Sequence, residues 1–180
     1  MDLKEIFGKA TIDQIKAGGS FTVIHRDKHG NVLSEETVHN LVTDDGINYM
    51  LNAALTGGTP ITAWYFAPWS ATYTPAAGDT YAVPGYTEAN AEISEATRQE
   101  WATVSSTSKS VTNTTAAVIT AASAVTIYGI GVVGGGTAAA TKGDAAGGGT
   151  LLASSAFAAS KTLAAGETLS ITYTCNGASA

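Results

Sequence analysis

Near its end the chain alternates apolar and hydroxyl-bearing residues without interruption, in the stretch ETLSITYTC. One set of alternate positions is apolar and the other polar: Leu169, Ile171, Tyr173 and Cys175 against Thr168, Ser170, Thr172 and Thr174. Because successive side chains of a β-strand point to opposite faces, this period of two predicts a strand with one buried and one solvated face. An antiparallel sheet is the usual setting for such a strand.

Short strand-like segments recur along the rest of the chain, separated by turns rich in Gly, Ser and Thr. They cover residues 61–69, 99–104, 110–119, 125–133 and 150–157, and a hairpin spans residues 20–42 around a polar turn at 27–31. Many short strands without alternating helices indicate a sandwich or barrel rather than a parallel fold. We therefore predict a mainly β protein, an antiparallel, jelly-roll-like β-sandwich that forms one domain over residues 20–180.

One internal segment, TDDGINYMLNAAL, breaks the β pattern because its apolar residues recur every three or four positions. Thr43 or Asp44 is the predicted N-cap, and Gly57 with Gly58 provides the stop. This stretch predicts one short internal helix.

The N-terminal residues also show helical spacing, at Leu3, Ile6, Phe7 and Ala10, with Ile12 and Ile15 extending the pattern. They predict a short helical arm over residues 1–19, ended by Gly18 and Gly19. The apolar stripe of such an arm can pack on its own domain or on a neighbouring molecule.

The charge balance excludes several classes of partner. Only 13% of the residues are charged, the formal net charge is -6 and the sequence pI is about 4.9. We therefore expect no nucleic-acid partner and no binding to an anionic membrane. The N-terminus lacks the apolar core of a standard signal peptide, and the uncharged span between Lys109 and Lys142 is too rich in polar residues for a membrane helix. Cys175 is the only cysteine, so no internal disulfide can form.

Residues 134–149 form a low-complexity insert of Gly, Ala and Thr in which only Lys142 and Asp144 are charged. Such a segment buries little surface, so we expect either a mobile loop or a segment ordered by another chain. Just before it, Gly129, Gly131 and Gly134 match the G-x-G-x-x-G pattern of dinucleotide sites. No helix follows them, so we expect no cofactor there.

The stretch GYTEANAEISEATRQEW concentrates charge in a chain that otherwise has little. Its glutamates, with Tyr86 or Trp101 as an apolar wall, would suit a pair of catalytic carboxylates, but nothing in the sequence sets two of them at a working distance. The three histidines, His25, His29 and His39, are not expected to converge, and His25 is expected to bond to backbone. We therefore predict no catalytic residue and no metal site.

An aromatic-rich segment, AWYFAPW, precedes the charged stretch. Strand alternation places Trp64 and Phe66 on one face and Tyr65 on the other. An exposed row of these rings, continued by Trp69 and Tyr86, would suit a protein interface or sugar binding, whereas buried rings would be ordinary core.

The order of several short motifs resembles a family of tailed-bacteriophage virion proteins. The motifs are a hairpin leading into NLVTDDG, AWYFAPW, AAGDT, GYTE, EATRQEW, SVTN and a final GETLSITYT strand. The resemblance covers nearly the whole chain from Gly18 onward. The insert at 134–149 and the N-terminal arm depart from the family pattern.

The resemblance implies a head decoration or minor head protein without catalytic activity, located on the capsid surface of the virion after assembly in the host cytoplasm. The implied partners are the major capsid protein and further copies of this chain. A tail, neck or fibre-base component is the first alternative, and a carbohydrate-binding module the second.

The resemblance suggests an interpretation of the charged stretch as an ordered loop. In this loop Glu95 and Arg98 are expected to pair, and Glu88 and Glu92 to face a partner or solvent. The candidate interface combines this loop with the aromatic residues: Trp64, Trp69, Tyr86, Glu88, Glu92, Glu95 and Arg98.

Overall fold

The computed structural model describes residues 15–106 and 108–179. Ten strands and one helix follow one another along this part of the chain, and their bounds are β1 Ile15–Arg26, β2 Val32–His39, β3 Leu41–Val42, α1 Asp44–Leu55, β4 Trp64–Trp69, β5 Gln99–Glu100, β6 Ser110–Thr112, β7 Ala117–Thr120, β8 Val125–Gly134, β9 Thr150–Leu163 and β10 Thr168–Ser179. No helix within the described residues is long and apolar enough to cross a membrane.

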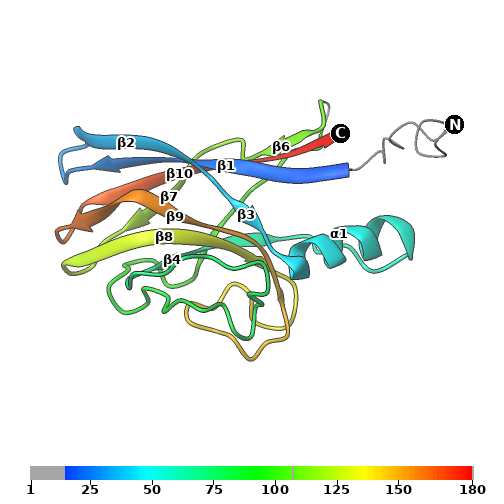
Figure 1. The fold of residues 1–180 in the computed structure, drawn as a ribbon. Helices are drawn as coiled ribbons and strands as arrows, with labels where there is room; N and C mark the ends of the chain where they lie inside the picture. Colours follow the sequence, from blue (N-terminus) through cyan, green and yellow to red (C-terminus); the bar gives the residue numbers. More distant parts are fainter. Residues whose placement is uncertain (1–14, 107, 180) are drawn as a thin grey trace, which may run out of the picture.

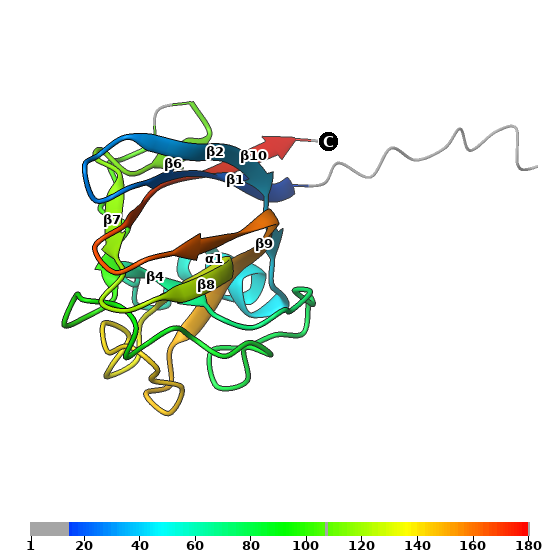
Figure 2. The same cartoon turned by 90° about the vertical axis from the view of Figure 1, so that its left-hand side faces the viewer.

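Two antiparallel sheets lie face to face (Figure 1). The first has the order β2-β1-β10-β6, with β7 also paired to β10, and the second has the order β3-β9-β8-β4-β5. The prediction of a mainly β, antiparallel sandwich with one short internal helix is therefore confirmed. Figure 2 shows the two sheets as layers, with the long loops after β4 and β8 gathered beyond the second sheet.

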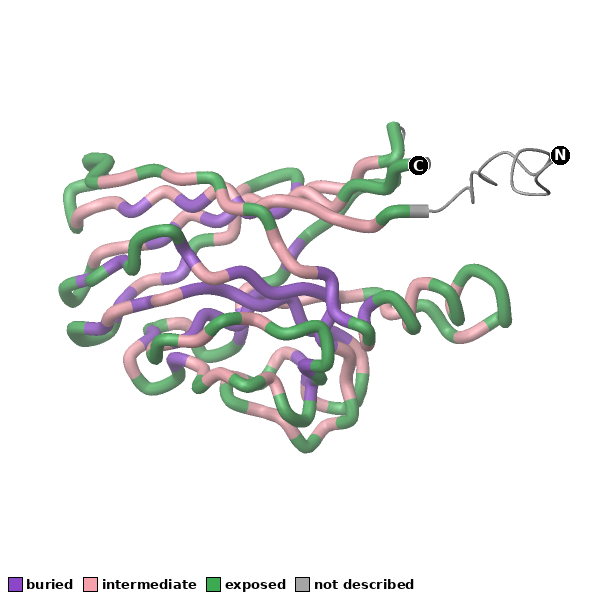
Figure 3. Tube along the Cα trace, viewed as in Figure 1, coloured by how far each residue is buried: buried purple, intermediate pink, exposed green. Residues whose placement is uncertain are grey.

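The core lies between the sheets, where the alternating residues of β1 and β10 point inward. Phe21 and Tyr173 are fully buried and stack with their ring centroids 4.3 Å apart. Phe66 of the second sheet meets Phe21 edge-on, at 6.4 Å. The hydroxyl-bearing residues between them, such as Thr22 and Thr172, are only partly covered (Figure 3). The period of two at the end of the chain thus forms one wall of the core, as predicted.

Helix α1 begins where the sequence predicts it. The Thr43 side chain accepts a hydrogen bond from the Gly46 amide at 3.0 Å, which satisfies one of the free donors at the helix start. The Asp45 carboxylate accepts from the Leu151 amide at 2.9 Å and ties the first turn to β9. Gly46 itself lies against the backbone of Leu152.

We expect Gly46→Ala to destabilise the protein by about 1–3 kcal/mol, because the added Cβ would overlap the Leu152 carbonyl. This reverses the usual sign, since Gly→Ala inside a helix ordinarily stabilises by about 1 kcal/mol. Urea unfolding of the parent and of Gly46→Ala measures the loss of stability. Gly78→Ala is the control, because no atom lies within 4 Å of a Cβ at that position. A Gly46→Ala protein as stable as the parent would contradict the close packing of α1 on β9.

The structure corrects the predicted helical arm where it can be compared. Residues 15–19 belong to strand β1 and pair with β10, from Ile15 opposite Ser179 to Gly19 opposite Cys175. Gly19 does not end a helix: it lets the strand pass close to the Thr174 carbonyl, where a Cβ would collide. Pairing with β10 satisfies the backbone groups of this segment, and so overrides its helical spacing. The rest of the predicted arm, residues 1–14, lies outside the described residues.

Three predicted strands are shorter than expected, and the first of them, 61–69, is reduced to β4. The segment 99–104 contributes only β5, and 110–119 is divided into β6 and β7 by a turn at Asn113. The buried Asn113 side chain donates to the carbonyls of Thr115 and Ile171 and accepts from the Tyr173 amide, at 2.8–3.0 Å. Those side-chain bonds replace pairing with β10 at this point, while Asn113 forms an isolated bridge with Thr103.

Candidate functional site

The charged stretch closes on a buried ion pair between Arg98 and Glu88. The Arg98 Nη2 atom lies 2.6 Å from Glu88 Oε2, and its Nε atom lies 2.9 Å from Oε1. The two side chains are only 3% and 7% exposed. A two-point contact of this kind matches the planar guanidinium to the carboxylate and is stronger than a neutral hydrogen bond.

The remaining guanidinium donors of Arg98 bind Tyr81 and the insert at 134–149. Nη1 donates to the Ala139 carbonyl at 2.9 Å and to the Tyr81 hydroxyl at 3.3 Å, and Nη2 donates to the Asp144 carbonyl at 2.9 Å. Burial lowers the pKa of Arg98 and the adjacent Glu88 carboxylate raises it; the carboxylate prevails, so the guanidinium stays charged. All five of its N–H groups therefore have partners within the chain.

Tyr81 and Asp144 complete what we call the Arg98 cluster, which comprises Tyr81, Glu88, Arg98 and Asp144. The Tyr81 hydroxyl donates to Asp144 Oδ2 at 2.7 Å, and the same oxygen accepts from the Gly147 amide at 3.0 Å. Burial raises the pKa of Tyr81, and the hydrogen bond to Asp144 raises it further. That hydrogen bond also lowers the pKa of Asp144.

The insert at 134–149 is thus held in place by contacts within its own chain. It is neither the mobile loop nor the segment ordered by another chain that the sequence led us to expect. Lys142 adds to this by donating to the carbonyls of Asn90 and Ile93 at 2.9 and 2.7 Å, and the Gly143 amide donates to Glu88 at 2.9 Å. The sequence-based expectation assumed that a segment with few large side chains cannot be ordered by its own domain. Backbone carbonyls and amides supply the contacts instead.

We expect the contribution of Asp144 to stability to disappear in acid. Because its pKa is lower in the folded state, the carboxylate stabilises the protein above its ordinary pKa, and this effect is lost as the pH falls through the lowered value. Urea unfolding between pH 6 and about pH 2 should therefore show Asp144→Asn less stable than the parent near neutrality, with the difference shrinking below about pH 4. Glu100→Gln, at an exposed site on β5, is the control. A difference that is constant with pH would contradict this role.

Two expectations about the glutamates are wrong. Glu95 does not pair with Arg98: its two carboxylate oxygens each lie 3.0 Å from the Thr120 amide of β7. Glu88, expected at the surface, is the buried partner of Arg98. The reason is an isolated bridge between Ile93 and Ala121, which carries the loop past β7 and leaves Glu95 beside that strand. Glu92 accepts from the Asn90 amide at 3.2 Å within a turn.

The aromatic residues are mainly core. Trp69 is fully buried and stacks on Tyr86 at 4.5 Å, and Tyr73 meets both rings edge-on. Burial is also the main reason why the pKa of Tyr86 is raised. Trp64 is partly covered and lies edge-on to Tyr49 of α1, at 5.2 Å. Trp69 and Arg98 therefore cannot be interface residues in this fold, and the rings do not form an exposed row.

Both faces of β4 are covered, which explains the buried aromatic residues. One face meets the first sheet, and the loops after β4 and β8 cover the other (Figure 2). A second, smaller cluster of apolar residues forms under these loops: Ala67, Tyr81, Val133, Ala139 and Leu151, with Tyr65 and Tyr86 packed against it. Strand alternation cannot distinguish exposed from buried residues where a sheet is covered on both sides.

The expectation for His25 is wrong, and no candidate metal site is found among the described residues. His25 Nε2 lies 3.0 Å from Glu167 Oε2. The partner of His25 is therefore a carboxylate, whereas a backbone partner was expected. Across residues 15–106 and 108–179, no three His, Cys, Asp or Glu side chains gather in a metal-binding arrangement.

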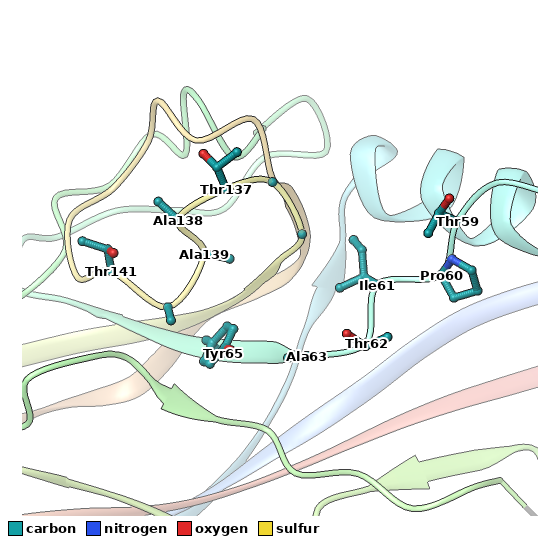
Figure 4. Close-up of a pocket in the computed structure, with 13 residues that line it drawn as sticks. Thr59, Pro60, Ile61, Thr62, Ala63, Tyr65, Thr137, Ala138, Ala139 and Thr141 are labelled. Carbon is teal, nitrogen blue, oxygen red and sulfur yellow. The ribbon is translucent and has the colours of Figure 1, made fainter.

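Two hollows lie on the loop-covered side. A groove of about 540 Å³ runs between residues 59–63 and the insert, and Figure 4 shows its lining of Thr, Ala and Gly with Ile61, Pro60 and Tyr65. The lining contains no carboxylate, imidazole or amine. A hollow of about 310 Å³ lies beside the Arg98 cluster, between Tyr86 and Asp144. Glu88, Arg98 and Asp144 are among its lining residues, and the Arg98 guanidinium there is fully occupied within the chain.

Sequence reasoning missed Tyr81, Asp144 and the carbonyl of Ala139 as partners of Arg98. They lie 17, 46 and 41 residues from it along the chain. No local spacing signals such contacts; an arginine that stands out in a charge-poor chain was the only hint.

Neither a scan against models of known protein families nor a search of curated proteins finds a match to this chain.

Proposed function

We propose that this protein is a non-enzymatic structural component of a tailed-phage virion, a decoration protein that binds the outer surface of the head and stabilises its lattice. The observation that carries the proposal is the Arg98 cluster. The stretch that carries much of the resemblance to phage virion proteins uses its charged side chains to close the chain on itself. Residues used in this way maintain a shape and are not free for chemistry.

The architecture supports a binding role of this kind. Two stacked sheets with a continuous core, and loops fastened to the second sheet, make a rigid body with a preformed surface. A rigid surface loses little conformational entropy on docking. On a head, many copies bind a repeating lattice of the major capsid protein, so weak individual contacts between copies and capsid subunits add together.

The test is co-sedimentation of the purified chain with expanded heads that lack it, followed by reconstruction of the pelleted particles. Density of this fold at regular positions of the lattice is the expected result. A matched control uses heads already saturated with the protein, which should bind no more of it. Density at one vertex only would overturn head decoration in favour of a neck or tail position.

A second measurement separates this role from sugar binding. Titration with a panel of oligosaccharides, followed by tryptophan fluorescence, should show no saturable quenching. Trp69 and Trp101 are buried, and the partly exposed Trp64 packs edge-on against Tyr49 and belongs to no exposed aromatic row. Saturable quenching without binding to heads would overturn the structural role.

A further inference from the structure

Helix α1 presents an apolar stripe to solvent. Ile47, Leu51 and Leu55 are 40%, 48% and 77% exposed, and they follow one another at intervals of four residues on one side of the helix. We call these three residues the α1 stripe. Figure 3 shows the far end of α1 exposed, projecting beyond the sheets.

The opposite side of the helix already has its partners. Met50 packs against the main core, and Tyr49 lies edge-on to Trp64 while its hydroxyl accepts from the Ile61 amide at 2.7 Å. A surface helix normally has one apolar face, which it turns to the core. Here α1 carries a second one. A row of three exposed aliphatic side chains at helical spacing is a candidate contact surface.

The start of β1 and helix α1 lie at the same end of the molecule (Figure 1). The Asn40 amide donates to the Gly19 carbonyl at 3.1 Å, and from Asn40 the chain passes through β3 directly into α1. Strand β1 begins four residues before Gly19, at Ile15, and Figure 1 places that beginning at the same end of the molecule as α1. The chain that precedes Ile15 is therefore attached at the same end of the molecule as α1 (Figure 1).

We propose that residues 1–14 of the same chain dock on the α1 stripe through their own apolar residues. Leu3, Ile6, Phe7 and Ala10 have the spacing of one helix face. Fourteen residues span about 21 Å as a helix and up to roughly 46 Å when extended, whereas α1 is about 18 Å long. The segment is therefore long enough to cover the stripe.

The covalent link favours this occupant over a second copy of the protein. A short tether holds a segment at an effective concentration in the millimolar range, well above that of a separate molecule in dilute solution. Two apolar stripes of three or four residues each are enough for such an intramolecular contact, whereas a stable dimer needs a much larger interface. This inference does not depend on the proposed function.

The test compares amide hydrogen exchange in α1 for the full-length protein and two of its variants. In Phe7→Ser the docking face loses its largest side chain, and exchange over the last two turns of α1 should become about tenfold faster. Glu5→Ser, which alters the opposite side of the same helical pattern, should leave exchange unchanged. Measurement at two protein concentrations, with the mass determined by light scattering, identifies the occupant.

Faster exchange in Phe7→Ser alone, at constant monomer mass, supports docking within one chain. Equal exchange in all three proteins overturns the inference. Protection of α1 that rises with concentration together with a doubled mass also overturns it, because the occupant is then a second copy. Cross-linking of Phe7→Cys to Leu51→Cys in a Cys175→Ser background checks the contact directly, with Glu5→Cys in place of Phe7→Cys as its control.

Discussion

Replacing Arg98 with alanine should lower the free energy of unfolding by about 3–5 kcal/mol, the range for removing one partner of a buried ion pair. The variant leaves the Glu88 carboxylate buried without its cation, because that side chain is only 7% exposed. It also removes the donors that hold the carbonyls of Ala139 and Asp144. Urea unfolding at neutral pH measures the loss, and hydrogen exchange should show the insert opening first.

Matched variants locate the source of this effect. Arg26→Ala removes an arginine whose side chain donates to the Gly30 carbonyl at an exposed turn, and should cost less than about 1 kcal/mol. Arg98→Lys keeps the charge but loses the two-point geometry, so an intermediate loss is expected. In a double-mutant cycle with Glu88→Gln, the combined loss should be smaller than the sum of the single ones. An Arg98→Ala protein as stable as Arg26→Ala would show that the Arg98 cluster does not hold the loops.

Replacing Trp69 with alanine should cost about 3–5 kcal/mol, as for other large aromatic residues removed from a core. Its ring is fully buried between Tyr86 and the backbone of β8, and a Cβ on Gly129 would overlap it. Both the lost contacts and the remaining cavity contribute. Thermal or urea unfolding measures the loss, and the near-ultraviolet dichroism of the stacked pair should fall with it.

Two comparisons sharpen the Trp69 result. Trp64→Ala should cost less, because that ring is only partly buried, between the core and Tyr49 of α1. Trp69→Phe keeps most of the buried ring and removes an indole N–H that has no hydrogen-bond partner among the described residues, so it should cost much less than alanine. If Trp64→Ala proved the more damaging of the two alanine variants, the loops over β4 would not be packed as the structure has them.

The burial of Arg98 and Trp69 limits which residues can be used to test binding to the capsid. Trp69 and Arg98 were candidate interface residues, and a loss of head binding on their replacement would reflect loss of the fold. Glu92 remains partly accessible to solvent in the described part of the chain, whereas the α1 stripe is assigned above to residues 1–14. Variants intended to disturb a contact with the capsid therefore belong at such sites.

The spacing of apolar residues, together with the residues that favour helix caps and turns, was sufficient to predict much of the architecture from the sequence. The alternation that ends at Cys175 predicts an inward and an outward face of β10, and both are found. Thr43 predicts the start of α1 because its side chain can cap a helix without help from distant residues. The turn at Gly30 needs the positive φ of 86° that glycine adopts readily. Each of these features depends on neighbours a few residues away.

Tertiary structure alone decided the partner of Arg98 and the burial of Trp69. Glu88 and Glu95 are equally plausible partners by spacing, and the path of the loop past β7 selects Glu88. Alternation places Trp69 on a face of β4 without revealing that the loops after β4 and β8 cover that face. Local sequence determines which groups need burial or a hydrogen bond, whereas the partner is chosen by whichever distant segment the folded chain brings within reach.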